Sequence, residues 1–205
     1  MASEPVVHVV DDDLSVRQAI QSLLESVGLR ARAYGSAAEF VSEEAWDGPG
    51  CVLLDVRMPG VSGLEFQTRM AGLGVTLPVI FVTGHGDIPM SVRGMKAGAV
   101  DFLTKPFRDQ DLLDAVSAAL ELDRERRALD ADVESLRTRY ASLSQREREV
   151  MRLVSAGRMN KQVAHELAIS EVTVKIHRGA AMRKMGARSL PDLVRMADLL
   201  GAAPE

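Results

Sequence analysis

The sequence predicts an α/β domain built on a five-stranded, doubly wound parallel sheet, joined by a long helical linker to an all-α domain of four helices. Two observations support this prediction. Short β-branched, apolar runs alternate with helical stretches through residues 1–120, which is typical of a parallel sheet covered on both faces. From residue 144 onward, cap residues and helical spacing mark a series of short helices. The 205 residues are enough for two domains of ordinary size.

Composition narrows the class of protein. Hydrophobic residues make up 46% of the chain, which is ordinary for a globular protein and excludes wholesale disorder. No apolar run reaches the length of about 18 residues that a membrane span requires. The single cysteine, Cys51, can form neither an intrachain disulfide nor a cysteine-based zinc site. Because the chain also lacks a basic, apolar start, we expect a cytoplasmic protein without a signal peptide or a membrane partner.

The net charge of −4 is the sum of two unlike halves. Residues 1–120 carry 9 basic and 16 acidic side chains, whereas residues 121–205 carry 16 basic and 13 acidic ones. The stretch 155–188 is the most basic, with 7 basic and 2 acidic residues. The two halves are therefore predicted to have different functions, although random variation of surface charge would also explain this difference.

Five strand–helix units are predicted in order along the N-terminal half. The expected strands are Val6–Val10, Ala31–Tyr34, Cys51–Leu54, Pro78–Val82 and Val100–Leu103. Apolar residues at helical spacing predict the helices between them, and Gly28 and Gly98 end two of these. The expected helices are Leu14–Val27, one capped by Ser36, Leu64–Leu73, Met90–Ala97 and a long one from Asp109.

Polar side chains follow these strands at the edge where parallel sheets place their sites. Three carboxylates meeting there would repel one another without a cation, and an oxygen-only set suits Mg²⁺ better than zinc. With an ammonium and a hydroxyl nearby, an aspartate nucleophile can accept a phosphoryl group. Taken singly, each residue can also be a turn or a cap, and Asp13 is expected to cap the helix from Leu14. The residues are Asp11, Asp12 and Asp13, then Asp55, Thr83 and Lys105.

These motifs resemble the receiver domain of two-component response regulators, a flavodoxin-like fold. The resemblance implies that Asp55 is the phosphoacceptor, and that Asp11, Asp12, Asp55 and the backbone carbonyl of Arg57 bind Mg²⁺. Lys105 and Thr83 would stabilise the phosphoryl group, with a cis peptide between Lys105 and Pro106. The matching stretches are Val9-Val10-Asp11-Asp12-Asp13, Leu54-Asp55-Val56-Arg57-Met58-Pro59-Gly60, Val82-Thr83-Gly84-His85-Gly86 and Lys105-Pro106-Phe107.

The same resemblance implies a switch and its partners. Thr83 and Phe102 would move on phosphorylation, although Phe102 alone would be taken as an ordinary core aromatic. Arg57 and His85 lie where the family tunes the phosphoryl lifetime. A histidine kinase would phosphorylate the chain, which would be no enzyme beyond self-catalysed phosphoryl acceptance and autodephosphorylation. The expected dimer face comprises Val92, Met95 and Lys96.

The linker is predicted to be helical because residues 109–139 contain neither glycine nor proline. The predicted domains are thus residues 1–120, a linker at 121–141 and residues 142–205. A heptad-like apolar seam runs along the linker, and Arg126 interrupts it. Two alternatives stay equally open: the seam pairs with a second copy, or it packs on the C-terminal domain of its own chain. The seam residues are Leu122, Leu129, Val133, Leu136, Tyr140 and Leu143.

The C-terminal segment predicts a helix-turn-helix. Ser144 and Glu147 form a capping box, and Asn160, Ser170 and Ser189 are expected to cap the next three helices. The turn at 168–170 separates two of these helices, and the second one is basic. On turn and charge alone, a helical docking bundle with a solvated basic face is as probable as a DNA-binding domain.

Residues 142–200 resemble the LuxR-type helix-turn-helix domain of NarL and FixJ response regulators, in particular the FixJ/StyR type. The matching stretches are Leu143-Ser144-Gln145-Arg146-Glu147-Arg148-Glu149-Val150, Asn160-Lys161-Gln162-Val163-Ala164, Val172-Thr173-Val174-Lys175-Ile176-His177-Arg178 and Lys184-Met185-Gly186-Ala187-Arg188-Ser189-Leu190. One departure is Gly179, at a position that is often basic in relatives. The DNA contacts implied are Lys161, Thr173, Val174, Lys175, Ile176, Arg178 and Lys184.

The two resemblances together imply a phosphorylation-activated transcription regulator, with double-stranded DNA, RNA polymerase and a second copy of the chain as partners. Two rival functions are alternatives to it. A phosphohydrolase of the haloacid-dehalogenase type needs a second aspartate two residues after the nucleophile, and this chain has Arg57 there. A phosphorelay or RNA-polymerase docking protein without direct DNA readout is the other alternative.

Overall fold

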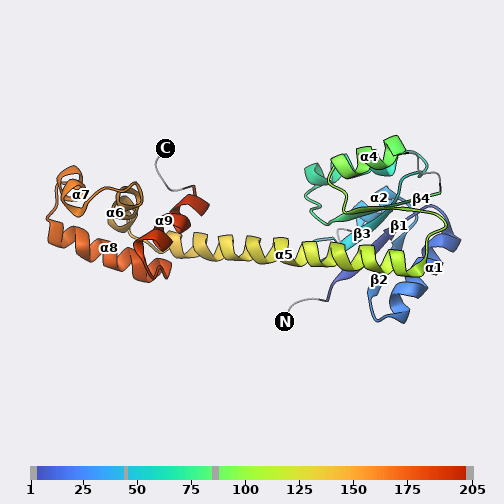
Figure 1. Cartoon of the computed structure of the whole chain (residues 1–205), viewed down its shortest axis with the longest axis horizontal. Helices are drawn as coiled ribbons and strands as arrows, with labels where there is room; N and C mark the ends of the chain where they lie inside the picture. Colours follow the sequence, from blue (N-terminus) through green and yellow to red (C-terminus); the bar gives the residue numbers. More distant parts are fainter. Residues whose placement is uncertain (1–3, 44–45, 85–87, 202–205) are drawn as a thin grey trace. The chain divides into compact units, whose positions relative to one another are not determined.

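The chain folds into two compact units, residues 1–127 and residues 128–205. The computed structural model describes residues 4–43, 46–84 and 88–201. The division falls inside one helix, α5 (Asp109–Ala141), so each unit contains part of it (Figure 1). In the parts of the chain that the structure describes, no helix is both long and apolar enough to cross a membrane.

The N-terminal unit is built on the predicted five-stranded sheet, in which every described pair of neighbouring strands is parallel. The strand order is β2-β1-β3-β4-β5, which is one of the two common orders of doubly wound sheets. The observed strands agree with the expected ones to within one residue at each end. They are β1 (Val6–Val10), β2 (Arg30–Tyr34), β3 (Gly50–Asp55), β4 (Val79–Thr83) and β5 (Asp101–Thr104).

Helices cover both faces of this sheet (Figure 1). Successive strand residues point to opposite faces, so Leu53 packs in the cluster with α1 and α5, and Leu54 in the cluster with α2 and α3. Asp13 caps α1 as predicted, because its carboxylate accepts hydrogen bonds from the backbone N–H groups of Ser15 and Val16. The last part of the third expected helix is instead a short 3₁₀ turn. The elements are α1 (Leu14–Ser26), α2 (Ala37–Ser42), α3 (Gly63–Met70), the 3₁₀ turn η1 (Ala71–Leu73) and α4 (Ile88–Lys96).

A buried carboxylate fastens α5 to the N-terminal unit. Asp123 is only 1% exposed, and it accepts hydrogen bonds from the backbone N–H of Gly50 at 3.0 Å and from Arg126 and Arg127 at 2.6 and 2.7 Å. Arg127 also donates to the carbonyls of Asp47 and Gly48. Burial by itself would raise the pKa of Asp123, but these hydrogen bonds outweigh burial and the pKa is lowered. The group fixes the helix against the chain that enters β3.

The C-terminal unit packs four helices and the end of α5 around one core. The capping box of α6 is present, with reciprocal hydrogen bonds between Ser144 and Glu147. Asn160, expected to cap α7, is instead its first residue. Met159 holds the cap position, and its backbone N–H donates to the side chain of Gln162 at 2.9 Å. Ser170 and Ser189 cap the next two helices as predicted. The helices are α6 (Gln145–Ser155), α7 (Asn160–Leu167), α8 (Glu171–Met185) and α9 (Leu190–Leu199).

The apolar seam of the linker divides into two parts. Leu136 and Tyr140 pack against the core of the C-terminal unit, and Leu143 is buried in that core. Leu122 and Leu129 are 49% and 67% exposed. The C-terminal part of the seam therefore packs on its own chain, while pairing of its N-terminal part with a second copy stays a prediction.

His8 is a titratable group buried in the middle of β1. Its ring is 1% exposed, lies 3.1 Å from the hydroxyl of Tyr34 and meets Phe40 edge-on. Burial, and then the nearby charge of Arg32, lower the pKa of His8 to about 4. The folded protein therefore holds this ring neutral near pH 7.

We expect His8 to make the stability of the N-terminal unit depend on pH. The unfolded chain titrates this histidine near pH 6.5, so below that value it binds more protons than the folded protein does. The free energy of unfolding then falls as the pH drops toward 4, by about 1 kcal/mol between pH 7.5 and 5.5. Urea unfolding followed by the fluorescence of Trp46, the single tryptophan, measures this change. The variant His8→Gln should lose this part of the pH dependence, and an unchanged dependence would contradict the assignment.

Replacement of Asp123 by alanine should destabilise the same unit strongly. The substitution leaves the Gly50 N–H and two arginines without their shared acceptor, and breaking a buried ion pair from one side costs about 3–5 kcal/mol. The measurement is again the urea midpoint from Trp46 fluorescence. Glu121→Ala is the matched control, since Glu121 pairs with Arg124 on the exposed side of the same helix and should change stability by less than about 1 kcal/mol. Equal effects of the two variants would refute the role assigned to Asp123.

Candidate functional sites

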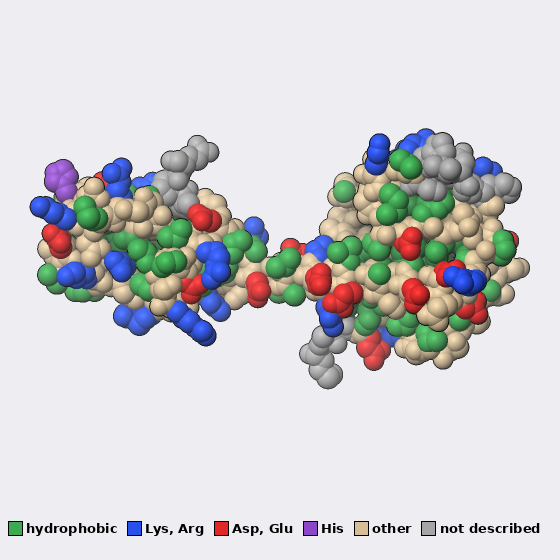
Figure 2. Space-filling view, viewed as in Figure 1, with side chains coloured by type: hydrophobic (Ala, Val, Ile, Leu, Met, Phe, Trp, Pro, Cys, Tyr) green, Lys and Arg blue, Asp and Glu red, His purple; other side chains and the backbone are tan. Residues whose placement is uncertain are grey.

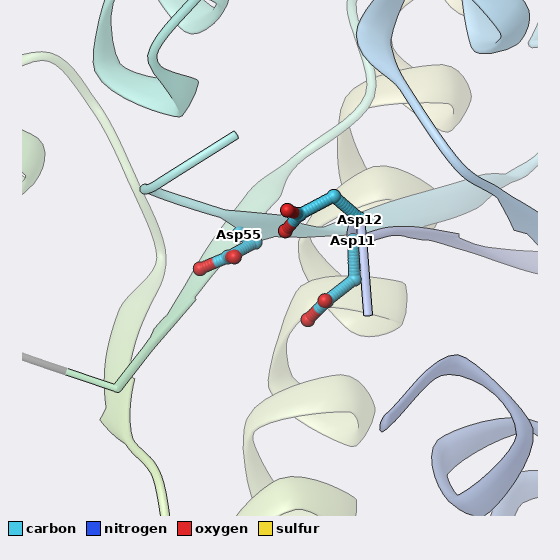
Figure 3. Close-up of side chains that lie close together, drawn as sticks. All are labelled: Asp11, Asp12 and Asp55. Atoms are coloured by element: carbon cyan, nitrogen blue, oxygen red, sulfur yellow. The ribbon is translucent and has the colours of Figure 1, made fainter. Parts of the chain in front are cut away.

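Three carboxylates gather at the carboxyl edge of the sheet. Asp11 and Asp12 directly follow β1, and Asp55 is the last residue of β3. Each offers an oxygen that lies within 4.8 Å of the others, and Figure 3 shows the three side chains together at the ends of these neighbouring strands. Asp11 and Asp55 are buried, whereas Asp12 is exposed. The sequence prediction that these residues meet is confirmed.

The strand register explains why they meet. β1 and β3 are paired so that Val10 lies opposite Leu54, and the next residue along each strand is an aspartate. After Asp55 the chain folds back, so that the start of α3 lies against the end of β3, where the backbone N–H of Gly63 donates to the carbonyl of Val56. A Cβ atom on Gly63 would lie 2.3 Å from the backbone oxygen of Asp55, so only glycine fits at the start of this helix.

Lys105 is the cation of this cluster. Its ammonium lies 2.5 Å from a carboxylate oxygen of Asp11 and 3.7 Å from one of Asp55. The backbone N–H of Lys105 donates to the carbonyl of Thr83, and the Lys105–Pro106 peptide is cis, as the resemblance implies. The β5–α5 connection thus holds the ammonium over the ends of β1 and β3.

The electrostatic balance of the site favours a cation. Burial raises the pKa of Asp55, and the negative charges of Asp11 and Asp12 raise it further. The positive charge of Lys105 lowers this pKa, but the net shift is upward. One ammonium faces three carboxylates, which leaves excess negative charge. All side-chain donors of the cluster are oxygens, which is the ligand type that Mg²⁺ prefers. The site therefore has the composition of a Mg²⁺ site. The side chain of Asp13 lies outside the cluster because it caps α1, while the backbone N–H of Asp13 donates to a carboxylate oxygen of Asp11 at 2.9 Å.

The other residues predicted to act in the receiver site differ in how far they are buried. Thr83 is fully buried at the end of β4, and Phe102 on β5 is partly buried with its ring 6.1 Å from that of Phe81. The backbone N–H of Arg57 donates to Asp55 at 3.4 Å, and its side chain lines a cleft of about 840 Å³ beside Asp12. His85 lies outside the described residues. On α4, the predicted dimer-face residues Val92, Met95 and Lys96 are all exposed.

The second candidate site is the helix pair α7–α8 of the C-terminal unit. The turn between them contains Ala168 in the left-handed conformation, with φ of 53°, and Ser170 caps α8. Lysine and arginine side chains lie along α8 (Figure 2). Lys161, Lys175 and Ile176 are exposed, as a surface that contacts DNA requires.

Not every predicted DNA contact lies on this surface. Val174 is fully buried, so the prediction that it contacts DNA is wrong. Its side chain packs in the core of the C-terminal unit and attaches α8 to that core. The ammonium of Lys184 binds the carboxylate of Glu147 at 2.6 Å and the carbonyl of Ser142 at 3.2 Å. Arg178 is partly buried and reaches the side chain of Asn160 at 3.4 Å. The position of each residue around the α-helix determines whether it faces outward. A motif match along the sequence does not contain that information.

Comparison with known families matches both units. Residues 7–117 match the family described as response regulator receiver domain. Residues 141–197 match the family described as bacterial regulatory proteins of the luxR family.

Individual relatives resemble the chain over nearly its whole length. Nodulation protein W of Bradyrhizobium diazoefficiens is 55% identical over 98% of this chain and 88% of its own. The transcriptional regulatory protein FixJ of Azorhizobium caulinodans is 46% identical over 97% of this chain and 94% of its own. A solved structure of the response regulator StyR has a TM-score of 0.83 and 45% identity, covering 96% of this chain and 99% of that one.

We expect Mg²⁺ to stabilise the N-terminal unit through the acidic cluster. A ligand that binds only the folded state at about ten times its Kd adds about 1.4 kcal/mol, which shifts the unfolding midpoint seen by Trp46 fluorescence. In Asp12→Asn this shift should vanish, and the ion-free protein should gain stability because one repulsive charge is removed. Asp13→Asn is the matched control and should keep the shift, since Asp13 caps α1. A full Mg²⁺ effect in Asp12→Asn would show that the ion binds elsewhere.

Proposed function

This chain belongs to the NarL/FixJ family of response regulators, and from this premise we propose that phosphorylation of Asp55 makes it dimerise and bind promoter DNA. It is a response regulator of a two-component system with a LuxR-type DNA-binding domain, and its FixJ relatives are transcription regulators. Members of this family are generally not enzymes. The observation that carries the proposal is the buried Asp55 beside two carboxylates and an ammonium.

Asp55 acts as the nucleophile toward a partner histidine kinase. A carboxylate oxygen of Asp55 attacks the phosphorus, and the bond between phosphorus and the kinase histidine breaks. Asp11, Asp12, Asp55 and the carbonyl of Arg57 would hold Mg²⁺, which when bound neutralises charge on the phosphoryl oxygens. Lys105 pairs with the phosphoryl group from the other side. Water later hydrolyses the aspartyl phosphate, and Arg57 and His85 set how long it lasts.

Thr83 and Phe102 carry the signal away from Asp55. The hydroxyl of Thr83 binds the new phosphoryl oxygens, and the ring of Phe102 turns inward from its half-buried position on β5. The face of α4 changes as a result, and Val92, Met95 and Lys96 pair with a second copy. Two exposed apolar side chains one turn apart, Val92 at 45% and Met95 at 48%, support this choice of face.

Dimers present two copies of α8 to successive turns of the DNA major groove. Lys175 and Ile176 face the bases, whereas Lys161, Thr173 and Arg178 bind the backbone. We assign phosphorylation to residues 1–120, DNA binding to 142–205, and the connection to 121–141, of which the part up to Arg127 is anchored to the N-terminal unit. The protein works in the cytoplasm and, once bound to a promoter, recruits RNA polymerase.

Light scattering of the intact chain tests the switch. Mg²⁺ with beryllium fluoride, which stands in for the phosphoryl group on Asp55, should convert a monomer into a dimer. Asp55→Asn removes the nucleophile and should stay monomeric under the same conditions. A chain that is already dimeric and does not respond would refute phosphorylation-driven dimerisation, and it would direct attention to the exposed Leu122 and Leu129 of α5.

A further inference from the structure

A stripe of residues on α8 faces away from the core of the C-terminal unit. Buried Val174, Ala181 and Met185 define the inner side of the helix. On the opposite side, helical period aligns the stripe residues Val172, Ile176, Gly179 and Arg183. Val172 and Ile176 are 67% and 63% exposed, and Arg183 is exposed. This stripe is the part of α8 that a bound duplex would meet first.

Gly179 leaves a gap in the stripe. A Cβ atom placed on Gly179 would have one neighbour within 4 Å, a guanidinium nitrogen of Arg183 at 3.7 Å. Long side chains on a helix lean toward its N-terminus, so Arg183 reaches back by one turn and lies beside the gap. The guanidinium thus lies close to the space that a side chain at position 179 would take.

Arg183 has no ion pair or hydrogen bond for its guanidinium within the described parts of the chain, unlike its neighbours. Lys184, the next residue, is held by Glu147 and Ser142. Arg139 donates to the carbonyl of Met185, and Arg148 to that of Ala141. A guanidinium that is exposed, unpaired and placed on the outward stripe is available for a phosphate, which it can bind in a bidentate manner.

We propose that Arg183 binds a phosphate of the DNA backbone and takes the place of the side chain that is missing at Gly179, whereas Lys184 is a structural residue. The inference rests on the proposed DNA-binding function and names a contact within it. The N-terminal residues of a recognition helix read base edges, so a guanidinium farther along the helix meets the backbone at the edge of the groove. The small Gly179 lets that guanidinium stay close to the helix.

Salt dependence of DNA binding tests this assignment. Fluorescence anisotropy measures binding of the full chain, with Mg²⁺ and beryllium fluoride, to duplexes of random sequence about 30 base pairs long. Arg183→Gln should reduce the slope of log affinity against log salt by about 0.9, because one phosphate contact is lost, and weaken binding about fivefold near 0.15 M salt. Lys184→Gln should keep the slope and instead lower the melting temperature of the C-terminal unit, since Glu147 loses its partner.

A rescue variant sharpens the test. In the double variant Gly179→Lys with Arg183→Gln, the new lysine enters the open space at position 179 and should restore the slope. Circular dichroism confirms that each variant is folded. If the wild-type chain binds no duplex in a salt-dependent way, the proposed function itself fails. If it binds and Arg183→Gln keeps the full slope, only the assignment of Arg183 fails.

Discussion

The parallel register of β1 against β3 is the constraint on which the N-terminal site depends. Backbone hydrogen bonds place Val10 opposite Leu54, so Asp11 and Asp55 become neighbours although their charges repel. Lys105 offsets part of this repulsion from the β5–α5 connection. The sheet therefore maintains an unfavourable charge arrangement at its carboxyl edge. Because Asp11 and Asp55 are buried, a change of charge at this edge alters the electrostatic energy of the site more than it would on an exposed surface. This sensitivity is what a phosphorylation switch needs.

Cations in this chain serve two purposes that composition cannot separate. Arg126, Arg127 and Lys184 bind carboxylates inside their own units and stabilise the fold. Arg183 differs from Lys184 by one position, yet one residue turns a helix by about 100°, so the two side chains face different surroundings. The basic character of the stretch 155–188 is therefore only partly available to a partner.

Local signals in the sequence were sufficient for most of the fold and for the acidic cluster. β1 has the predicted bounds, and parallel strands necessarily bring their carboxyl ends to one edge, so Asp11, Asp12 and Asp55 could be grouped in advance. Asp123 could not be recognised, because a carboxylate in a highly charged helix looks like part of a solvated face until its tertiary partner, the Gly50 N–H, is known. The prediction that Val174 contacts DNA is wrong, because a motif match covers a stretch of sequence and does not distinguish the side of the helix that faces the core.

The Asp123 anchor also determines where this protein can be divided. The receiver match ends at residue 117, yet the acceptor for the Gly50 N–H lies at residue 123 and its arginine partners at 126 and 127. Fusion partners or shortened chains that join at the family boundary would remove that acceptor and leave a buried donor unpaired. A chimaera that exchanges the N-terminal unit therefore has to include α5 up to Arg127. The first turns of the linker are structurally part of the N-terminal unit.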